Sequence, residues 1–440
     1  MKRLIAGCMA LLLICSAKAQ VIQKTNIGDT IVKELRKDDT LRYALNFRQG
    51  GVYKFTVRQL GIGIYYQLSD PSGRMLVRSD APEDIDDIER FDFDATQSGT
   101  YTFRMNRFKH PENPESGRFS LLIDSLPPRE IERRKMIRQS LVKENQKVVL
   151  TRDIDHFWIA FDRLKVCRNF ADSCRSFQEE YLDKATDGLR DFIRVRDLTA
   201  EKYARMAARY PKFLSSIRNN TTLVKQWELA VNNVFARFAK RYPAFKPLKV
   251  CFAMGILNTG GTVSNRFVLV GTELAASTIN ADLSEFPPGA FKERLAFQGD
   301  LTQKVISLIA HECVHTQQPP VSSSGDSCPL LAQSLREGVA DFVGELISGD
   351  SYTKNHEYGN ANEKNLWQEF KQTMCSKKTE YWLYNATTIK GRPSDLGYYI
   401  GYRIAKTYYA KHTDKSAALK EIIGITDPQD FLTRSGYDPK

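Results

Sequence analysis

The stretch that decides the fold of the larger part of the chain reads VISLIAHECVH, residues 305–315. It ends in an HExxH motif, in which His311 and His315 are four positions apart. Residues i and i+4 share one face of an α-helix, so both imidazoles can reach one zinc ion at about 2.0–2.1 Å. Glu312 lies about 100° round the helix from His311, where its carboxylate can contact a metal-bound water. The apolar residues before the motif predict that this helix is buried.

A third zinc ligand is predicted in the stretch LREGVADF, residues 335–342. Glu337 follows His315 by 337 − 315 = 22 residues and completes a His₂Glu site with a fourth position left for water. Asp341 lies four residues later on the same helix face, where it can accept the spare N–H of His311 and fix its tautomer. Two imidazoles, one carboxylate and an open position are what a metalloprotease needs.

Other ligand arrangements fit the sequence less well. An extended metzincin motif would have glycine at Gln318 and histidine at Val321. His356 stays as an alternative third ligand, although no typical zinc spacing surrounds it. Cys313 lies about 200° round the helix from His311 and points away from the metal, so we interpret it as a core residue or a disulfide partner.

Two tyrosines are candidates for an oxyanion-stabilising role. Hydrolysis of a peptide bond needs a hydrogen-bond donor for the tetrahedral oxyanion in addition to zinc. Tyr398 and Tyr402 are spaced i, i+4 on a predicted helix after Gly397, and either can serve as a catalytic residue together with the general base Glu312. The alternative is that both tyrosines are packing residues. Arg392 and Arg403 are weaker candidates.

The N-terminal part of the chain has the alternation of β-strands. Between about residues 25 and 124, apolar and polar side chains alternate with period two, most clearly at Tyr53, Phe55, Val57, Tyr101, Phe103 and Met105. Asp70-Pro71-Ser72-Gly73 is typical of a turn between the runs 64–68 and 75–78. The pattern predicts an all-β sandwich over residues 20–126.

This segment resembles the bacterial pre-peptidase C-terminal domain, a jelly-roll-like sandwich attached to secreted peptidases. The resemblance rests on residues 39–47 and 51–57, on the turn at 68–73 and on residues 99–103. It implies a binding, folding-assistance or spacer module, here placed before the catalytic part.

The chain changes character after the Pro127-Pro128 pair. Residues 127–147 are dense in Arg, Lys and Glu and predict a charged linker helix. From 148 to 440 the pattern is mainly helical, with strand-like runs at 248–254 and 266–271, which predicts an α+β catalytic domain. The second run is either an exposed edge, to which an extended peptide adds as a further strand, or a buried strand.

The two zinc motifs together resemble the gluzincin pattern of the thermolysin-like clan. The wider segment 153–409 is similar to a family of predicted bacterial zinc-dependent proteases. The matching stretches are 153–158, 181–192, 260–262, 311–315, 337–342 and 397–402. The resemblance implies a zincin-like fold, a Zn²⁺ cofactor and a protein or peptide substrate.

The N-terminus predicts export. Lys2 and Arg3 precede the apolar run 4–15, and Ala17 and Ala19 offer the small residues that a signal peptidase reads. A signal peptide of residues 1–19, cleaved before Gln20, would deliver the protein to the periplasm, the cell surface or the exterior. Lipidation at Cys8, which follows Ile-Ala-Gly, is an alternative. No other apolar run is long enough to span a bilayer.

The net charge and the cysteine content bear on nucleic-acid binding and on disulfide formation. The formal net charge is 64 − 52 = +12, and the charges are scattered apart from the linker. We see no nucleic-acid-binding module and expect no nucleic-acid partner. Six cysteines remain after cleavage, and an exported chain can hold them as disulfides or as buried thiols. They are Cys167, Cys174, Cys251, Cys313, Cys328 and Cys375.

The sequence thus predicts an exported zinc metallopeptidase with a His₂Glu site. One alternative is a catalytically silent zincin scaffold that acts as a cell-envelope binding or assembly protein, with the β-sandwich as its partner module. Another is a zinc amidase that acts on cell-wall peptides. The sequence carries no signal for oligomeric state.

Overall fold

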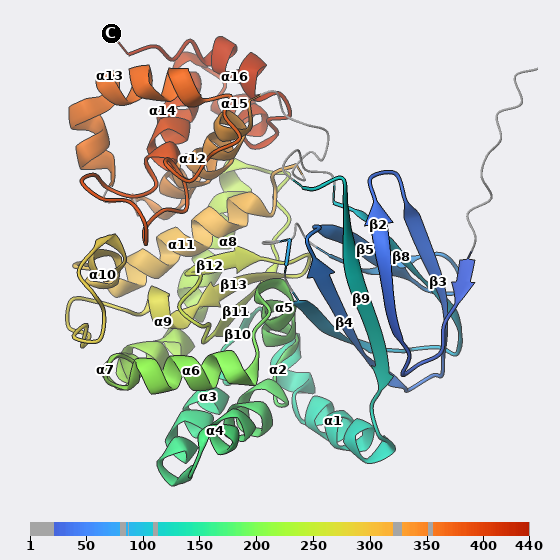
Figure 1. The fold of residues 1–440 in the computed structure, drawn as a ribbon. Coiled ribbons are helices and arrows are strands. Elements are labelled where there is room, and N and C mark those ends of the chain that lie inside the picture. The colour runs from blue at the N-terminus through green and yellow to red at the C-terminus, as the bar shows by residue number, and fades with distance from the viewer. Residues whose placement is uncertain are drawn as a thin grey trace, which may run out of the picture. The chain divides into compact units, whose positions relative to one another are not determined.

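The computed structural model describes residues 22–79, 85–86, 88–108, 113–319, 328–350 and 355–439. The chain divides into two compact units, the first built mainly from residues before Pro127 and the second mainly from Pro127 onward (Figure 1). Each unit is described by itself. The predicted signal peptide and its cleavage site lie outside the described residues.

Two β-sheets form the first unit. One has the strand order β1-β3-β8-β5-β6 and the other the order β2-β9-β4-β7. The strands are β1 (Ile22–Lys24), β2 (Thr30–Arg36), β3 (Thr40–Phe47), β4 (Val52–Leu60), β5 (Ile64–Ser69), β6 (Met75–Arg78), β7 (Ile88–Asp94), β8 (Gly99–Arg107) and β9 (Ser116–Ser125).

The alternating side chains point into a shared core, as the period-two pattern predicts. Phe55 on β4, in one sheet, has its ring centroid 6.2 Å from that of Phe47 and 5.2 Å from that of Phe103, both in the other sheet. All three are buried. Aromatic pairs at these distances stabilise the packing beyond the area they bury. The β-sheet character of the N-terminal part is therefore confirmed.

A four-stranded sheet of order β10-β11-β13-β12 lies in the second unit. Its strands are β10 (Val149–Leu150), β11 (Lys249–Ala253), β12 (Gly261–Val263) and β13 (Phe267–Gly271). β13 runs parallel to β11 and antiparallel to β12. The run at 266–271 is thus an interior strand, fully buried over Phe267–Gly271, and not the exposed edge that was one of two interpretations. The edge strand on this side is β12.

Helices make up the rest of the second unit, which confirms its mainly helical character (Figure 1). The charged segment after Pro127 forms two helices with Leu141 between them, where the sequence predicts one linker helix. The α-helices are α1 (Pro128–Ser140), α2 (Val142–Gln146), α3 (Arg152–Arg163), α4 (Phe170–Phe177), α5 (Asp187–Arg196), α6 (Ala200–Arg209), α7 (Pro211–Thr222), α8 (Glu228–Arg241), α9 (Thr272–Ala275), α10 (Ala290–Leu295), α11 (Leu301–His315), α12 (Pro329–Ser348), α13 (Asn355–Thr373), α14 (Leu396–Lys411), α15 (Lys415–Ile423) and α16 (Pro428–Ser435).

Helix α12 packs closely against both α11 and α14. Asp300 caps α11 by accepting hydrogen bonds from the backbone N–H groups of Thr302 and Gln303. α12 and α14 cross at Gly338 and Gly401, where a Cβ on either glycine would overlap the backbone of the other helix. Only glycine allows such a close approach of two helix backbones. This crossing fixes α14 next to Glu337.

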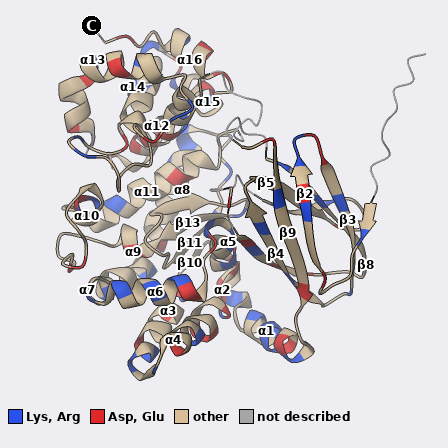
Figure 2. Ribbon diagram, viewed as in Figure 1, with Lys and Arg blue, Asp and Glu red and all other residues tan. Residues whose placement is uncertain are grey.

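Charged side chains of both signs are distributed over the helices and strands, as Figure 2 shows. Among the described residues, no helix has the length and apolar character needed to cross a bilayer.

One disulfide joins Cys328 at the start of α12 to Cys375 just after α13. Among the described residues, the four other cysteines are free, including Cys167 and Cys174. Cys313 is buried in the core of the second unit, which is one of its two predicted placements.

We expect removal of this disulfide to destabilise the second unit. The bond spans 47 residues, and closing a loop of that length lowers the entropy of the unfolded chain by an amount worth about 4 kcal/mol. Urea unfolding of C328S/C375S should show most of this loss. The control C167S/C174S removes two thiols without removing a crosslink, and an equal loss in both double variants would contradict the role of the disulfide.

Candidate metal centre

The last turn of α11 carries the two histidines of the HExxH motif. The Nε2 atoms of His311 and His315 lie 3.0 Å apart, with the rings at 82° to each other. The residues before the motif are largely buried, with Val305, Ile309 and Ala310 at most 1% exposed. The packed face of α11 therefore holds both imidazoles in place.

Glu337 on α12 faces both histidines. Its Oε2 lies 3.5 Å from His311 Nε2 and 3.2 Å from His315 Nε2. The three side chains are only 10–12% exposed. The structure thus brings together two residues of α11 and one of α12 whose ligand atoms all lie within 4.8 Å of one another.

The outer nitrogens of both imidazoles are committed to other partners. His311 Nδ1 lies 2.8 Å from Asp341 Oδ1, and His315 Nδ1 lies 2.8 Å from Gln318 Oε1. The Gln318 amide is itself oriented, because its Nε2 donates to the Arg336 carbonyl. Carboxylate and amide oxygens only accept hydrogen bonds, so each Nδ1 carries a proton, and in the neutral form of each ring Nε2 carries the lone pair that a metal would bind.

Burial and charge oppose each other at Glu337 and His311. Burial raises the pKa of Glu337, but the charges and hydrogen bonds of His315 and His311 outweigh it and hold that pKa well below its ordinary value. Burial likewise lowers the pKa of His311, but Asp341 and Glu337 hold it well above its usual range. The site is therefore built to retain a carboxylate next to positive charge.

The donor atoms fit a divalent cation. In a tetrahedral zinc site with bonds of about 2.0–2.1 Å, neighbouring ligand atoms lie about 3.3 Å apart. The separations here are 3.0, 3.2 and 3.5 Å. A cation bound here would replace the proton that His311 otherwise shares with Glu337, because an imidazole must be deprotonated at the nitrogen that binds a metal. His311, His315 and Glu337 are the residues that could hold the ion.

Glu312 lies beside this cluster under the edge strand. Its side chain is buried, and a Cβ at Gly261 on β12 would collide with the Glu312 carboxylate. Burial raises the pKa of Glu312, against the lowering effects of His311, His315 and Arg196. Arg196 at the end of α5 donates to Thr262 of the same strand. The close contact explains why glycine occupies position 261.

The two candidate tyrosines have different surroundings. The Tyr398 ring lies parallel to that of His311, with centroids 6.4 Å apart. The Tyr402 hydroxyl donates to Glu345 Oε2 at 2.7 Å and accepts from Lys406 at 2.6 Å. The Tyr398 ring therefore lies next to the cluster, whereas the Tyr402 hydroxyl is hydrogen-bonded to Glu345 and Lys406.

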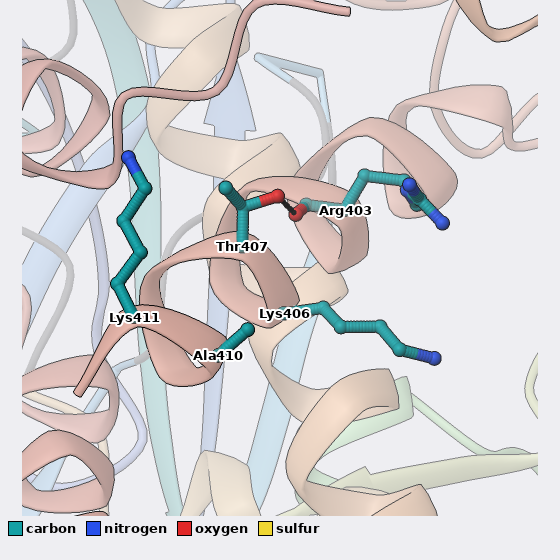
Figure 3. Close-up of a pocket in the computed structure, with 5 residues that line it drawn as sticks. All are labelled: Arg403, Lys406, Thr407, Ala410 and Lys411. Atoms are coloured by element: carbon teal, nitrogen blue, oxygen red, sulfur yellow. Dashed lines mark hydrogen bonds between the residues drawn. The ribbon is translucent and has the colours of Figure 1, made fainter. Parts of the chain in front are cut away.

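A hollow of about 390 Å³ lies on the outer face of α14, where Figure 3 shows Arg403, Lys406 and Lys411 around Thr407 and Ala410. Each of the three cations is already engaged. Arg403 is ion-paired with Glu363, Lys406 contacts Tyr402 and Glu345, and Lys411 donates to the Ser435 carbonyl. This arrangement directs Arg403 away from the metal-ligand cluster.

The remaining weaker candidates also lie elsewhere. Arg392 is ion-paired with Glu369 and stacks on the Tyr381 ring, 3.8 Å from its centroid. The His356 ring packs on Tyr402 at 4.2 Å, so Glu337 and not His356 completes the three-ligand cluster.

Two residues at the cluster escaped the sequence analysis. Tyr384 donates a hydrogen bond of 2.8 Å to Glu337 Oε1, and Gln318 accepts from His315. Gln318 follows His315 by three residues, a helical spacing that could have been noticed. Tyr384 lies in a loop without periodicity, so no pattern in the sequence indicates it.

A buried carboxylate supports the loop that leads to β12. Glu273 on α9 is fully buried and accepts hydrogen bonds from the backbone N–H groups of Gly255 and Leu257. Burial raises the pKa of Glu273 to about 7, although these two bonds oppose the shift. The loop after β11 leads to Gly261, which lies against the Glu312 carboxylate. An ionisable group, Glu273, therefore holds this loop through two hydrogen bonds.

The comparisons with known proteins give a family for the C-terminal segment. Residues 350–439 match the family model of gliding motility protein GldB. The matched part is a minor share of the chain, so the chain is similar to this family over that segment. It contains α13 to α16, Tyr384 and Tyr398. No curated protein matches the chain.

This match corrects the sequence analysis. The resemblance to predicted bacterial zinc-dependent proteases of the gluzincin type was wrong, because the matching family is one of gliding motility proteins. The prediction of a metallopeptidase that hydrolyses peptide bonds was therefore wrong as well. The physical reason is that HExxH with a later Glu specifies ligands on two helices, and such ligands serve other purposes as well as hydrolysis.

Two solved structures resemble a quarter of the chain. The pre-peptidase C-terminal domain of collagenase from Bacillus anthracis is 17% identical, over 24% of this chain and 96% of that chain, with a TM-score of 0.20. The periplasmic g-type lysozyme inhibitor PliG from Aeromonas hydrophila is 13% identical, over 24% of this chain and 100% of that chain, with a TM-score of 0.19. Scores this low carry no argument about fold or function.

The raised pKa of Glu273 predicts a pH-dependent stability. The folded state keeps its proton up to about pH 7, whereas the unfolded state loses it near 4.5, so stability falls as pH rises between these values. We expect Glu273→Gln to flatten the change in unfolding free energy between pH 5 and 8 by about 2–3 kcal/mol. Urea unfolding at both pH values measures it.

Asp153 provides the control for this prediction. It is also fully buried, and burial raises its pKa to about 7. Asp153→Asn should therefore flatten the same profile while leaving the Glu273 contribution in place. A Glu273→Gln profile as steep as that of the wild type would contradict a raised pKa at Glu273.

Proposed function

We propose that the chain is a cell-envelope protein that works by binding, as a non-hydrolytic zincin-like scaffold. In this proposal His311 and His315 on α11 and Glu337 on α12 bind one zinc ion, which crosslinks the two helices. The observation that carries it is the attachment of the gliding-motility-like segment to the ligand cluster. Tyr384 of that segment is hydrogen-bonded to Glu337, and Tyr398 lies against His311.

The burial of the ligands supports a structural ion. The three side chains come from two helices and are only 10–12% exposed, so an ion held by them would join two buried elements of the core. Bound there, the ion would supply positive charge to the converging lone pairs and a crosslink between α11 and α12. The crosslink would stabilise the platform on which α14 and the rest of the gliding-motility-like segment pack.

The envelope location is supported at the other end of the chain. The basic residues and apolar run at the N-terminus are those of an exported protein. Export agrees with similarity to a gliding motility protein. The β-sandwich unit then offers a second surface for a partner in the envelope.

The proposed centre predicts one zinc per chain. His315→Ala and Glu337→Ala should each lose most of the bound zinc in elemental analysis of dialysed protein, because each removes one of three protein ligands. With zinc a thousandfold above its Kd, the wild type should be about 4 kcal/mol more stable than its metal-free form. Wild-type protein without zinc after refilling would overturn the centre.

The binding role makes a separate prediction at Glu312. Glu312→Gln keeps the size of the side chain and removes no ligand, so the variant should hold zinc like the wild type. Restored to a deletion strain of the source organism, it should support envelope function, scored as colony spreading, as well as the wild type does. His315→Ala should not.

Two results would contradict the proposed binding role. Peptide cleavage by the zinc-loaded wild type that disappears in Glu312→Gln would contradict a non-hydrolytic scaffold. Loss of colony spreading in Glu312→Gln, at normal protein level and zinc content, would contradict it as well.

A further inference from the structure

The two oxygens of Glu337 have different partners. Oε2 faces the two imidazole Nε2 atoms, at 3.2 and 3.5 Å. Oε1 accepts the hydrogen bond from the Tyr384 hydroxyl at 2.8 Å. A carboxylate held in this way offers one oxygen to a metal and is hindered from turning to offer both.

The backbone at Tyr384 is held in an unfavourable conformation. Its φ is +54°, in the left-handed region that residues with a Cβ rarely adopt. Such strain persists only where the surrounding structure enforces it. Tyr384 as a whole is 64% exposed, so burial of apolar surface is a weak reason for its position. Its hydroxyl donates to Glu337, and its ring makes an edge-on contact with the Tyr398 ring, with the centroids 6.2 Å apart.

The loop around Tyr384 is braced on both sides. Asn385 and Asp395 exchange hydrogen bonds, each side-chain oxygen accepting from the backbone N–H of the other residue. Trp382 is buried, and its carbonyl accepts from the Gly397 N–H at the start of α14. These bonds present the Tyr384 hydroxyl at a fixed place, which is the requirement for orienting a ligand of a metal.

We infer that Tyr384 is a positioning residue, which fixes Glu337 as a one-oxygen metal ligand and thereby couples the gliding-motility-like segment to metal loading. The inference deepens the proposed function and rests on its metal centre. Because the hydroxyl bond joins the ligand to the loop 379–396, an ion that immobilises Glu337 also immobilises this loop. The surface offered by the segment then depends on whether the centre holds its ion.

Tyr384→Phe tests the inference in the full mature chain, since it removes one oxygen and keeps the ring. Zinc affinity is measured by competition with a chromophoric chelator, and coordination by the visible absorption of the cobalt(II)-substituted protein. We expect zinc to bind 10–100-fold more weakly. The cobalt absorption should also weaken, because Glu337 becomes free to supply its second oxygen and raise the coordination number.

The matched control is Tyr381→Phe, in the same loop and 49% exposed. It should leave affinity and cobalt spectrum unchanged. Hydrogen exchange of residues 379–396 gives the second readout, because zinc should slow it in the wild type and much less in Tyr384→Phe.

Unaltered zinc affinity, cobalt spectrum and zinc-dependent protection in Tyr384→Phe would overturn the inference while leaving the metal centre in place. Wild-type protein that binds no zinc would overturn the centre and the inference together. Tyr384→Phe could also destabilise the metal-free protein. If that loss of unfolding free energy equals the whole loss of zinc-binding free energy, the residue has a general structural role and the inference is overturned.

Discussion

The convergence of two imidazole nitrogens and one carboxylate oxygen between α11 and α12 is the constraint on which the second unit depends. Asp341 and Gln318 accept hydrogen bonds from the outer nitrogens of His311 and His315, so both inner nitrogens face Glu337. A buried carboxylate in this position needs positive charge beside it, from a proton on His311 or from a bound cation. The packing that holds α11 against α12 therefore also keeps these three side chains close together.

The packing around the crossing supports that reading. The glycine contact between α12 and α14 brings the C-terminal segment against Glu337, and the disulfide fixes the start of α12. On the other side, Gly261 lets the edge strand rest on Glu312. The site therefore lies between packed helices on one side and the edge strand on the other.

Some of this organisation follows from the sequence and some does not. Alternation at Phe55 and Phe103 predicts strands because a sheet has two faces, and the i, i+4 spacing of His311 and His315 predicts a shared helix face. The interior position of β13 does not follow, since a short apolar run fits an edge or a centre equally well. Tyr384 acts from a strained loop, where neither periodicity nor a motif exists.

The error about function has a different origin. A ligand pattern identifies the chemistry of a site, whereas the use made of that chemistry depends on the whole chain. Here the segment after α12 matches a gliding motility family and supplies residues to the same site.

The most direct test of the central claim is a crystal structure of the mature protein with anomalous data at the zinc edge. The account predicts one anomalous peak about 2.0–2.1 Å from the Nε2 atoms of both histidines and from a single oxygen of Glu337, with Tyr384 on the other oxygen. A crystal grown with zinc that shows no peak there, and whose histidine side chains have turned apart, would contradict it.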